Sequence, residues 1–140
     1  MKKTQIVIAI DFDGTIVEHE YPNIWKPIRG AIQTIKELQA RGHKIILWTM
    51  RSGRELENAV IYLQENGITP WGVNRNPEQD WSDSPKVYAQ IYIDDAALGC
   101  PIEQIGKLRP MVYWPYVRNF LISKGLLSVS SGQSDTAAVG

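Results

Sequence analysis

The sequence has little of what marks a secreted, membrane or nucleic-acid-binding protein. Its one cysteine, Cys100, excludes an intramolecular disulfide and fits a reducing compartment. Basic and acidic residues number 15 each, and this formal net charge of zero argues against a broad surface for nucleic acid or lipid. No apolar run approaches the roughly 20 residues of a membrane span, and the run at 6–10 is too short for a signal peptide. We therefore expect a cytoplasmic protein with no membrane partner.

Length and composition predict a single domain. Hydrophobic residues make up 44% of the 140 positions and charged residues 21%, which is ordinary for a globular chain that buries a core. From Ser128 onward the residues are small or polar and show no periodicity. We expect residues 1–127 to form the domain and residues 128–140 to be a disordered tail, or a segment that becomes ordered on a partner.

Short apolar runs alternate with segments of helical period along the domain. The runs predict strands at 5–10, 44–48, 71–74, 91–93 and 111–114. The periodic segments predict helices at 27–42, 52–67 and 115–123, the second opened by a capping box at 52–55, with a brief helical turn at 84–85. This alternation predicts an α/β fold with a doubly wound, mainly parallel sheet and helices on both of its faces.

Carboxylates follow two of the expected strands. Asp11 and Asp13 end the first strand, and Asp94 and Asp95 end the fourth; Thr49 ends the second. Alternate residues of an extended chain point the same way, and ligands of such sheets bind beyond the carboxyl ends of the strands. Four carboxylates meeting there would repel one another unless they shared a cation. Oxygen ligands alone favour a hard ion, and Mg²⁺ is the usual choice beside phosphate.

The same groups suit phosphoryl transfer. A carboxylate such as Asp11 can attack phosphorus and give an aspartyl-phosphate. Asp13 could protonate the leaving oxygen and later activate water. Thr49 offers a hydroxyl and nearby backbone N–H groups to the phosphoryl oxygens, and Lys86 supplies a positive charge that holds phosphate and nucleophile together.

In their order and spacing, these residues resemble the four motifs of the haloacid dehalogenase (HAD) superfamily. The motifs are D-x-D-G-T at 11–15, the threonine of "IILWT", the lysine at 86 and the "IYIDD" pair, and the match extends from Ile6 to Asp95. The aspartate at position 13 resembles the phosphatase and phosphotransferase branches of the superfamily. The resemblance therefore implies a Rossmann-like fold and a hydrolase.

The resemblance also implies a role for each motif residue. Asp11 would be the nucleophile and Asp13 the general acid and base, while Thr49 and Lys86 would bind phosphate. Mg²⁺ would be held by the Asp11 carboxylate, the Asp13 backbone carbonyl and Asp95. Asp94 would act through water or support a ligand, and which acid of the pair binds the metal directly stays open.

The segments between the motifs have no room for the specificity cap common in that superfamily. Between Thr15 and Thr49 the chain can hold a short flap and one helix, and between Thr49 and Asp94 one helix, a short strand and a loop. We expect a capless member with an open site. Such members act on large substrates or borrow a cover from another subunit of a homo-oligomer.

The leading hypothesis is a Mg²⁺-dependent phosphatase that hydrolyses a phosphomonoester of a small molecule or a polymer end. The alternatives are a catalytically silent HAD-like scaffold that binds phosphorylated ligands, and a nucleotidase or polynucleotide end phosphatase. Trp81 and Tyr88 either stack on a base or sugar or serve in packing. A receiver-type signalling module fits less well, because its acids, threonine and lysine come in another order along the chain.

Other polar and aromatic residues near the motifs have two interpretations each. Arg51 and Arg54 flank the phosphate-binding turn and either contact the substrate or form a solvated helix start. His19, Tyr21 and Trp25 lie in the expected flap and either touch the leaving group or pack on the rim of the site.

Overall fold

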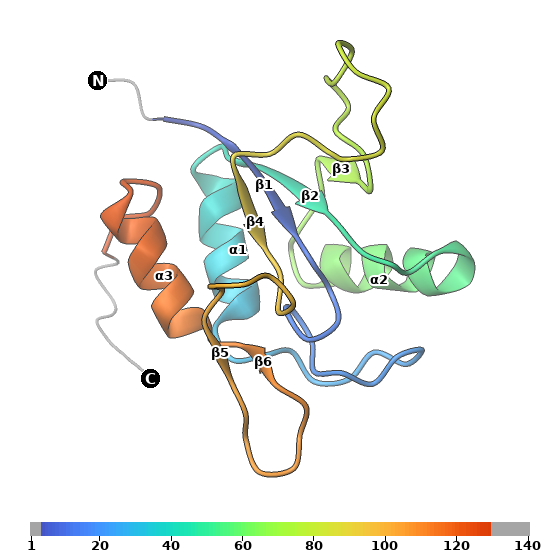
Figure 1. The fold of residues 1–140 in the computed structure, drawn as a ribbon, viewed down its shortest axis with the longest axis vertical. Helices are drawn as coiled ribbons and strands as arrows, with labels where there is room; N and C mark the ends of the chain where they lie inside the picture. Colours follow the sequence, from blue (N-terminus) through green and yellow to red (C-terminus); the bar gives the residue numbers. More distant parts are fainter. Residues whose placement is uncertain (1–3, 130–140) are drawn as a thin grey trace.

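The computed structural model describes residues 4–129, in which strands and helices alternate (Figure 1). In chain order the elements are β1 (Val7–Ile10), α1 (Ala31–Ala40), β2 (Lys44–Leu47), α2 (Gly53–Glu65), β3 (Gly72–Val73), β4 (Ile91–Ile93), β5 (Ile102–Glu103), β6 (Met111–Val112) and α3 (Trp114–Ser123). Most of the expected tail, from residue 130, lies outside the described residues.

Four strands form a parallel sheet in the order β3-β2-β1-β4. In the register of β1, Ile10 lies opposite Leu47 of β2 and Ile93 of β4. All four strands therefore end at the same edge of the sheet, and β1 is an inner strand with a neighbour on each side. This arrangement places the residue after each of these strands at one edge, as the sequence predicts.

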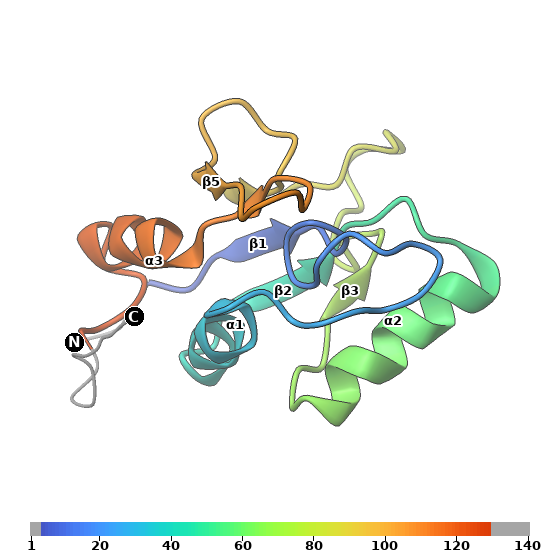
Figure 2. The same ribbon diagram turned by 90° about the horizontal axis from the view of Figure 1, so that it is seen from below.

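The core lies on the face of the sheet to which Ile8 and Ile10 of β1 point. Buried residues of all three helices belong to this core, among them Ile35 of α1, Leu63 of α2 and Leu121 of α3. Figure 2 shows α1 and α2 side by side along this face. The helices form because their apolar residues recur at helical spacing and can be buried here.

The opposite face is smaller and is covered by irregular chain. Ala9 and Ile46 point to it, and Val87 of the segment 74–90 packs on them. The helical turn expected at 84–85 does not form, and this segment contains only bends and turns. The Gln79 side chain donates to the Lys86 carbonyl at 3.0 Å and accepts the Tyr88 N–H at 2.7 Å, so these backbone groups are bonded outside a helix.

The last expected strand pairs differently from the prediction. β6 joins β5 in a separate antiparallel hairpin instead of extending the parallel sheet. The hairpin is tied to the site edge, since the Val112 N–H donates to the Gly14 carbonyl at 2.9 Å. The Trp114 indole N–H donates to the Thr15 carbonyl at 2.7 Å and fixes the start of α3 against the same loop.

The fold class predicted from the sequence is confirmed as α/β and Rossmann-like, with a mainly parallel sheet flanked by helices and no separate cap. The expectation of helices on both faces is wrong, because the connection from β3 to β4 covers the second face without forming a helix. Within residues 4–129, no helix is both long enough and apolar enough to cross a bilayer.

Candidate functional site

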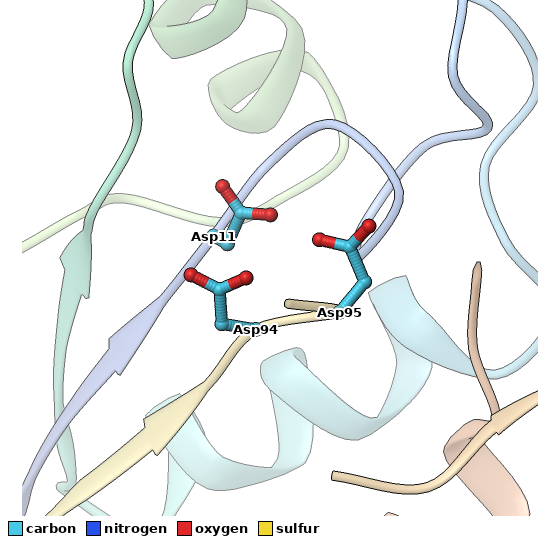
Figure 3. A group of neighbouring side chains, drawn as sticks. All are labelled: Asp11, Asp94 and Asp95. Atoms are coloured by element: carbon cyan, nitrogen blue, oxygen red, sulfur yellow. The ribbon is translucent and has the colours of Figure 1, made fainter. Parts of the chain in front are cut away.

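Three carboxylates meet at the edge where β1 and β4 end. Asp11 follows β1, and Asp94 and Asp95 follow β4; one oxygen from each lies within 4.8 Å of the other two (Figure 3). The Asp11 backbone N–H donates to the Ile93 carbonyl at 2.9 Å, so the pairing of β1 with β4 continues into the site. The sheet itself therefore holds these acids together.

Burial and mutual repulsion act on this cluster. The pKa of Asp11 is raised from 3.8 to about 8, chiefly by burial and then by the charge of Asp94. Burial also raises the pKa of Asp94, and Asp95 adds to the effect. These shifts mean that the folded protein opposes full ionisation of the cluster unless a cation is bound.

The loop after β1 orients two of the three acids through a threonine hydroxyl. Thr15 Oγ1 is buried; it donates to Asp11 Oδ2 at 2.9 Å and accepts the Asp95 N–H at 3.1 Å. Because the hydroxyl accepts from the backbone, its own proton is directed to Asp11. Thr15 belongs to the D-x-D-G-T motif, and this motif is the sequence signal that could have indicated its role.

Gly14 makes room for a contact between the segment after β1 and the clustered acids. Its φ of +81° favours glycine, and a Cβ there would lie 2.1 Å from His19 Nε2 and 2.5 Å from Asp95 Oδ2. His19 Nε2 lies 3.0 Å from Asp95 Oδ2. His19 therefore contacts an acid of the cluster and does not simply pack on the rim.

The expectation that four carboxylates share one spot is wrong for Asp13. Its two carboxylate oxygens accept hydrogen bonds from Arg51 Nε and a terminal Arg51 nitrogen, both at 2.8 Å. Arg51 is 2% exposed, which rules out the solvated helix start considered for it. A buried guanidinium beside the strand end attracts Asp13, whereas Asp11 points to the other acids.

Thr49 follows β2 at the same edge, with its hydroxyl proton free to donate. Its backbone N–H donates to Asn74 Oδ1 at 2.8 Å, and its Oγ1 accepts the Arg51 N–H at 3.1 Å. Two of the backbone N–H groups expected to serve a phosphate are thus engaged within the protein. In the described part of the chain, the Met50 N–H has no acceptor.

Lys86 is not paired with the acids in this conformation. Its side chain is exposed, and Nζ lies 5.9 Å from the centre of the Tyr92 ring. Nowhere in residues 4–129 does Lys86 form an ion pair. Tyr92 packs with the smaller cluster around Ala9, and Asp11 and Asp94 are two residues beyond Ala9 and Tyr92. Lys86 therefore lies over the face of the sheet from which these two acids extend.

The donor set fits a hard divalent cation. Asp11, Asp94 and Asp95 each offer a carboxylate oxygen within one small space, with no sulfur ligand among them. All-oxygen sites of this kind suit Mg²⁺, and the raised pKa of Asp11 gives a physical reason for a cation to bind. The Asp13 side chain is outside this set, so any part of Asp13 in metal binding would come from its backbone carbonyl.

No family model and no curated protein matches the chain. Among solved structures, one described as a conserved protein from Bacteroides thetaiotaomicron is similar, with 34% sequence identity and a TM-score of 0.72. The similarity covers 86% of this chain and 93% of that one. At this identity and coverage, the chain belongs to the same family as that conserved protein.

Proposed function

We propose that the protein is a Mg²⁺-dependent phosphatase of the HAD type, which hydrolyses a phosphomonoester through an aspartyl-phosphate on Asp11. One observation supports this most directly: Asp11, Asp94 and Asp95 gather at the carboxyl edge of the sheet, with Thr49 at the next strand end. An aspartate with a raised pKa in that cluster needs a cation to be an ionised nucleophile.

In the proposed reaction, Asp11 attacks phosphorus. Thr15 holds Asp11 Oδ2, which leaves Oδ1 for the attack. As the new bond from Oδ1 to phosphorus forms, the bond from phosphorus to the leaving oxygen breaks, and this oxygen takes a proton from Asp13. Water then attacks the phosphorus and gives a proton to Asp13, and the bond to Asp11 breaks, which releases inorganic phosphate and restores both acids.

Metal binding would involve the three clustered acids. A bound Mg²⁺ supplies positive charge that offsets their repulsion and the charge on the phosphoryl oxygens. Thr15 and His19 contact Asp11 and Asp95, so they fix the directions in which these carboxylates point.

Asp13 can take part while it is bound to Arg51. A carboxylate has about four lone-pair positions, and Arg51 occupies two of them. Each oxygen of Asp13 can therefore still exchange a proton with the leaving group or with water.

The phosphate would be held by groups that follow β2. Within residues 4–129, the Thr49 hydroxyl and the Met50 N–H of this turn donate to no other group of the protein and could serve the phosphate. Lys86 would join them only by leaving the Tyr92 ring, which is feasible for a long, exposed side chain.

Exposed apolar side chains on three loops support a substrate with a sizeable organic group. Tyr21 and Trp25 belong to the segment after β1, Met50 follows β2, and Leu98 follows β4; all four are more than half exposed. With no cap over the site, such a group could lie against these side chains, whether it belongs to a small molecule or to a polymer end. We place this activity in the cytoplasm because the chain has a single cysteine.

A panel of phosphomonoesters tests the proposal. The purified protein should release phosphate from at least one member with Mg²⁺ and from none in EDTA. Asp11→Asn should abolish release because an amide cannot attack phosphorus. Asp80→Asn, the same change at an exposed loop residue, is the matched control and should keep full activity. Release at the wild-type rate by Asp11→Asn would refute the assignment of the nucleophile.

A further inference from the structure

Arg51 is a buried cation in the loop between β2 and α2. Only 2% of the residue is exposed, although guanidinium groups are almost never fully buried without partners. Burying a charge is costly unless it is paired and hydrogen-bonded. The environment of Arg51 must therefore offset that cost.

All five N–H donors of the guanidinium have an acceptor. Two donate to the Asp13 carboxylate at 2.8 Å. Two donate to backbone carbonyls of the flap, which we define as residues 18–26: Pro22 at 3.1 Å and Asn23 at 2.9 Å. The fifth donates to the Glu55 carbonyl in the first turn of α2 at 3.3 Å. Since a guanidinium has five donors in total, none is left for a substrate phosphate.

Two aromatic rings lie against the same guanidinium. The rings of Phe12 and Tyr21 each lie with their centre 5.0 Å from Arg51 Cζ. Phe12 belongs to the loop that carries Asp13, and Tyr21 belongs to the flap. Both the hydrogen bonds and the ring contacts of Arg51 therefore join the same two segments, and lysine, with three donors and no planar group, could not replace them.

We propose that Arg51 is a positioning residue, which holds the Asp13 carboxylate and the flap as one unit. Among the described residues, the Asp13 side chain forms hydrogen bonds to Arg51 alone. Arg51 thus fixes the direction of Asp13 and sets the flap beside it. The effect of Arg51 on catalysis rests on the proposed function, in which Asp13 protonates the leaving oxygen. The mechanical link between Asp13 and the flap is independent of the proposed function.

Amide hydrogen exchange tests the link without any activity. The Asn23 N–H, bonded to the Glu20 carbonyl at 2.9 Å, reports on the flap, and the Trp48 N–H, bonded to the Ile10 carbonyl at 2.9 Å, reports on the sheet. In Arg51→Lys and in Asp13→Asn, exchange at Asn23 should accelerate by about tenfold or more, since charged hydrogen bonds are lost. Exchange at Trp48 should change much less.

Arg29→Gln is the matched control, because Arg29 is exposed and has no side-chain partner within the described residues. It should leave exchange at both amides unchanged. Unchanged exchange at Asn23 in Asp13→Asn would overturn the link. Equal acceleration at Asn23 and Trp48 would also overturn it, since Arg51 would then serve only general stability.

A comparison of leaving groups tests the catalytic consequence. An aryl phosphate such as p-nitrophenyl phosphate needs little protonation of its leaving oxygen, whereas an alkyl phosphate such as glycerol 2-phosphate needs more. Arg51→Lys should therefore lower kcat for the alkyl ester about tenfold more than for the aryl ester, within the range of acid–base contributions. In the Asp13→Asn background, Arg51→Lys should have no such selective effect.

The outcomes separate the two proposals. Equal losses on both esters, or faster turnover of the alkyl ester by Arg51→Lys than by wild type, would refute a positioning role in catalysis. A wild-type protein that hydrolyses no phosphomonoester would refute the proposed function, and the exchange experiment would still decide whether Arg51 links Asp13 to the flap.

Discussion

Asp11→Asn should stabilise the metal-free protein, and the gain should grow with pH. In the folded protein the pKa of Asp11 is about 8, against an ordinary value of 3.8. Between these values the unfolded chain ionises Asp11 while the folded protein keeps the proton. The unfolded state therefore binds fewer protons, and the free energy of unfolding falls as pH rises. The loss is absent below the ordinary pKa of Asp11 and complete above its folded pKa.

The size of this effect follows from the number of protons. One proton taken up on folding costs about 1.4 kcal/mol of stability for each pH unit. Between pH 5 and 7 wild type should therefore lose on the order of 2–3 kcal/mol through Asp11. This is a large share of the roughly 5–15 kcal/mol that stabilises a typical domain. The slope of the unfolding free energy between pH 5 and 7 requires only that the pKa of Asp11 in the folded protein lies above 7. The total loss of stability, in contrast, depends on the value of that pKa.

Urea titrations in EDTA at several pH values between 4 and 8 would measure the effect. Asp11→Asn should match wild type near pH 4 and exceed it increasingly up to pH 8, because the amide keeps an acceptor for the Thr15 hydroxyl and carries no charge. Asp80→Asn should follow wild type at every pH, since its side chain is exposed. Saturating Mg²⁺ should remove the difference in slope. If Asp11→Asn were less stable than wild type at pH 8 in EDTA, Asp11 would be a structural acceptor and the reasoning would be wrong.

Three further predictions concern the same loop. Mg²⁺ affinity measured by calorimetry should rise about tenfold from pH 6 to 7 and level off above the Asp11 pKa of about 8, because binding releases the proton of Asp11. An affinity that does not change with pH would contradict this. Gly14→Ala should cost more than about 1 kcal/mol in urea titrations and exceed Gly99→Ala, because both have positive φ and only Gly14 has His19 where a Cβ would lie. Thr15→Val should cost about 1–3 kcal/mol by leaving buried polar groups unpaired, and Thr15→Ser should restore most of it if the hydroxyl, rather than the methyl group, is responsible.

Most of the parallel sheet could be predicted from the sequence, because its central strands are covered on both faces. Such strands are continuous apolar runs, and the runs predicted at 5–10 and 44–48 contain the inner strands β1 and β2. In a parallel sheet the carboxyl ends of the strands meet at one edge. The predicted sheet was therefore enough to place Asp11, Asp94 and Asp95 close together.

Elements that depend on distant contacts could not be predicted in this way. β6 lies within the strand predicted at 111–114, but its antiparallel partner β5 has only two residues, too few to show a period. The hairpin that the two strands form could therefore not be predicted. Ser84 and Pro85 have the residue types of a helix start, yet the segment around them instead crosses the sheet and contributes Val87 to the smaller core. Ser52 does precede α2, but its side chain forms no capping hydrogen bond.

The different surroundings of Asp11 and Asp13 show most clearly where local pattern stops being informative. The two acids are separated by one residue, and the alternation of side chains along an extended chain would by itself give them the same environment. The fold instead places Asp11 among carboxylates and Asp13 on a buried guanidinium. Two acids with different partners can take different roles, which is what nucleophile and acid–base chemistry in one site requires. The residue that separates them is Arg51, which comes 38 positions after Asp13 and also donates to a backbone carbonyl of the flap. The pairing of Arg51 with Asp13 could therefore not be predicted from the spacing of the two residues. Whether a charged residue near a motif is exposed or paired depends on the segments that pack around it, and the fold decides which segments these are.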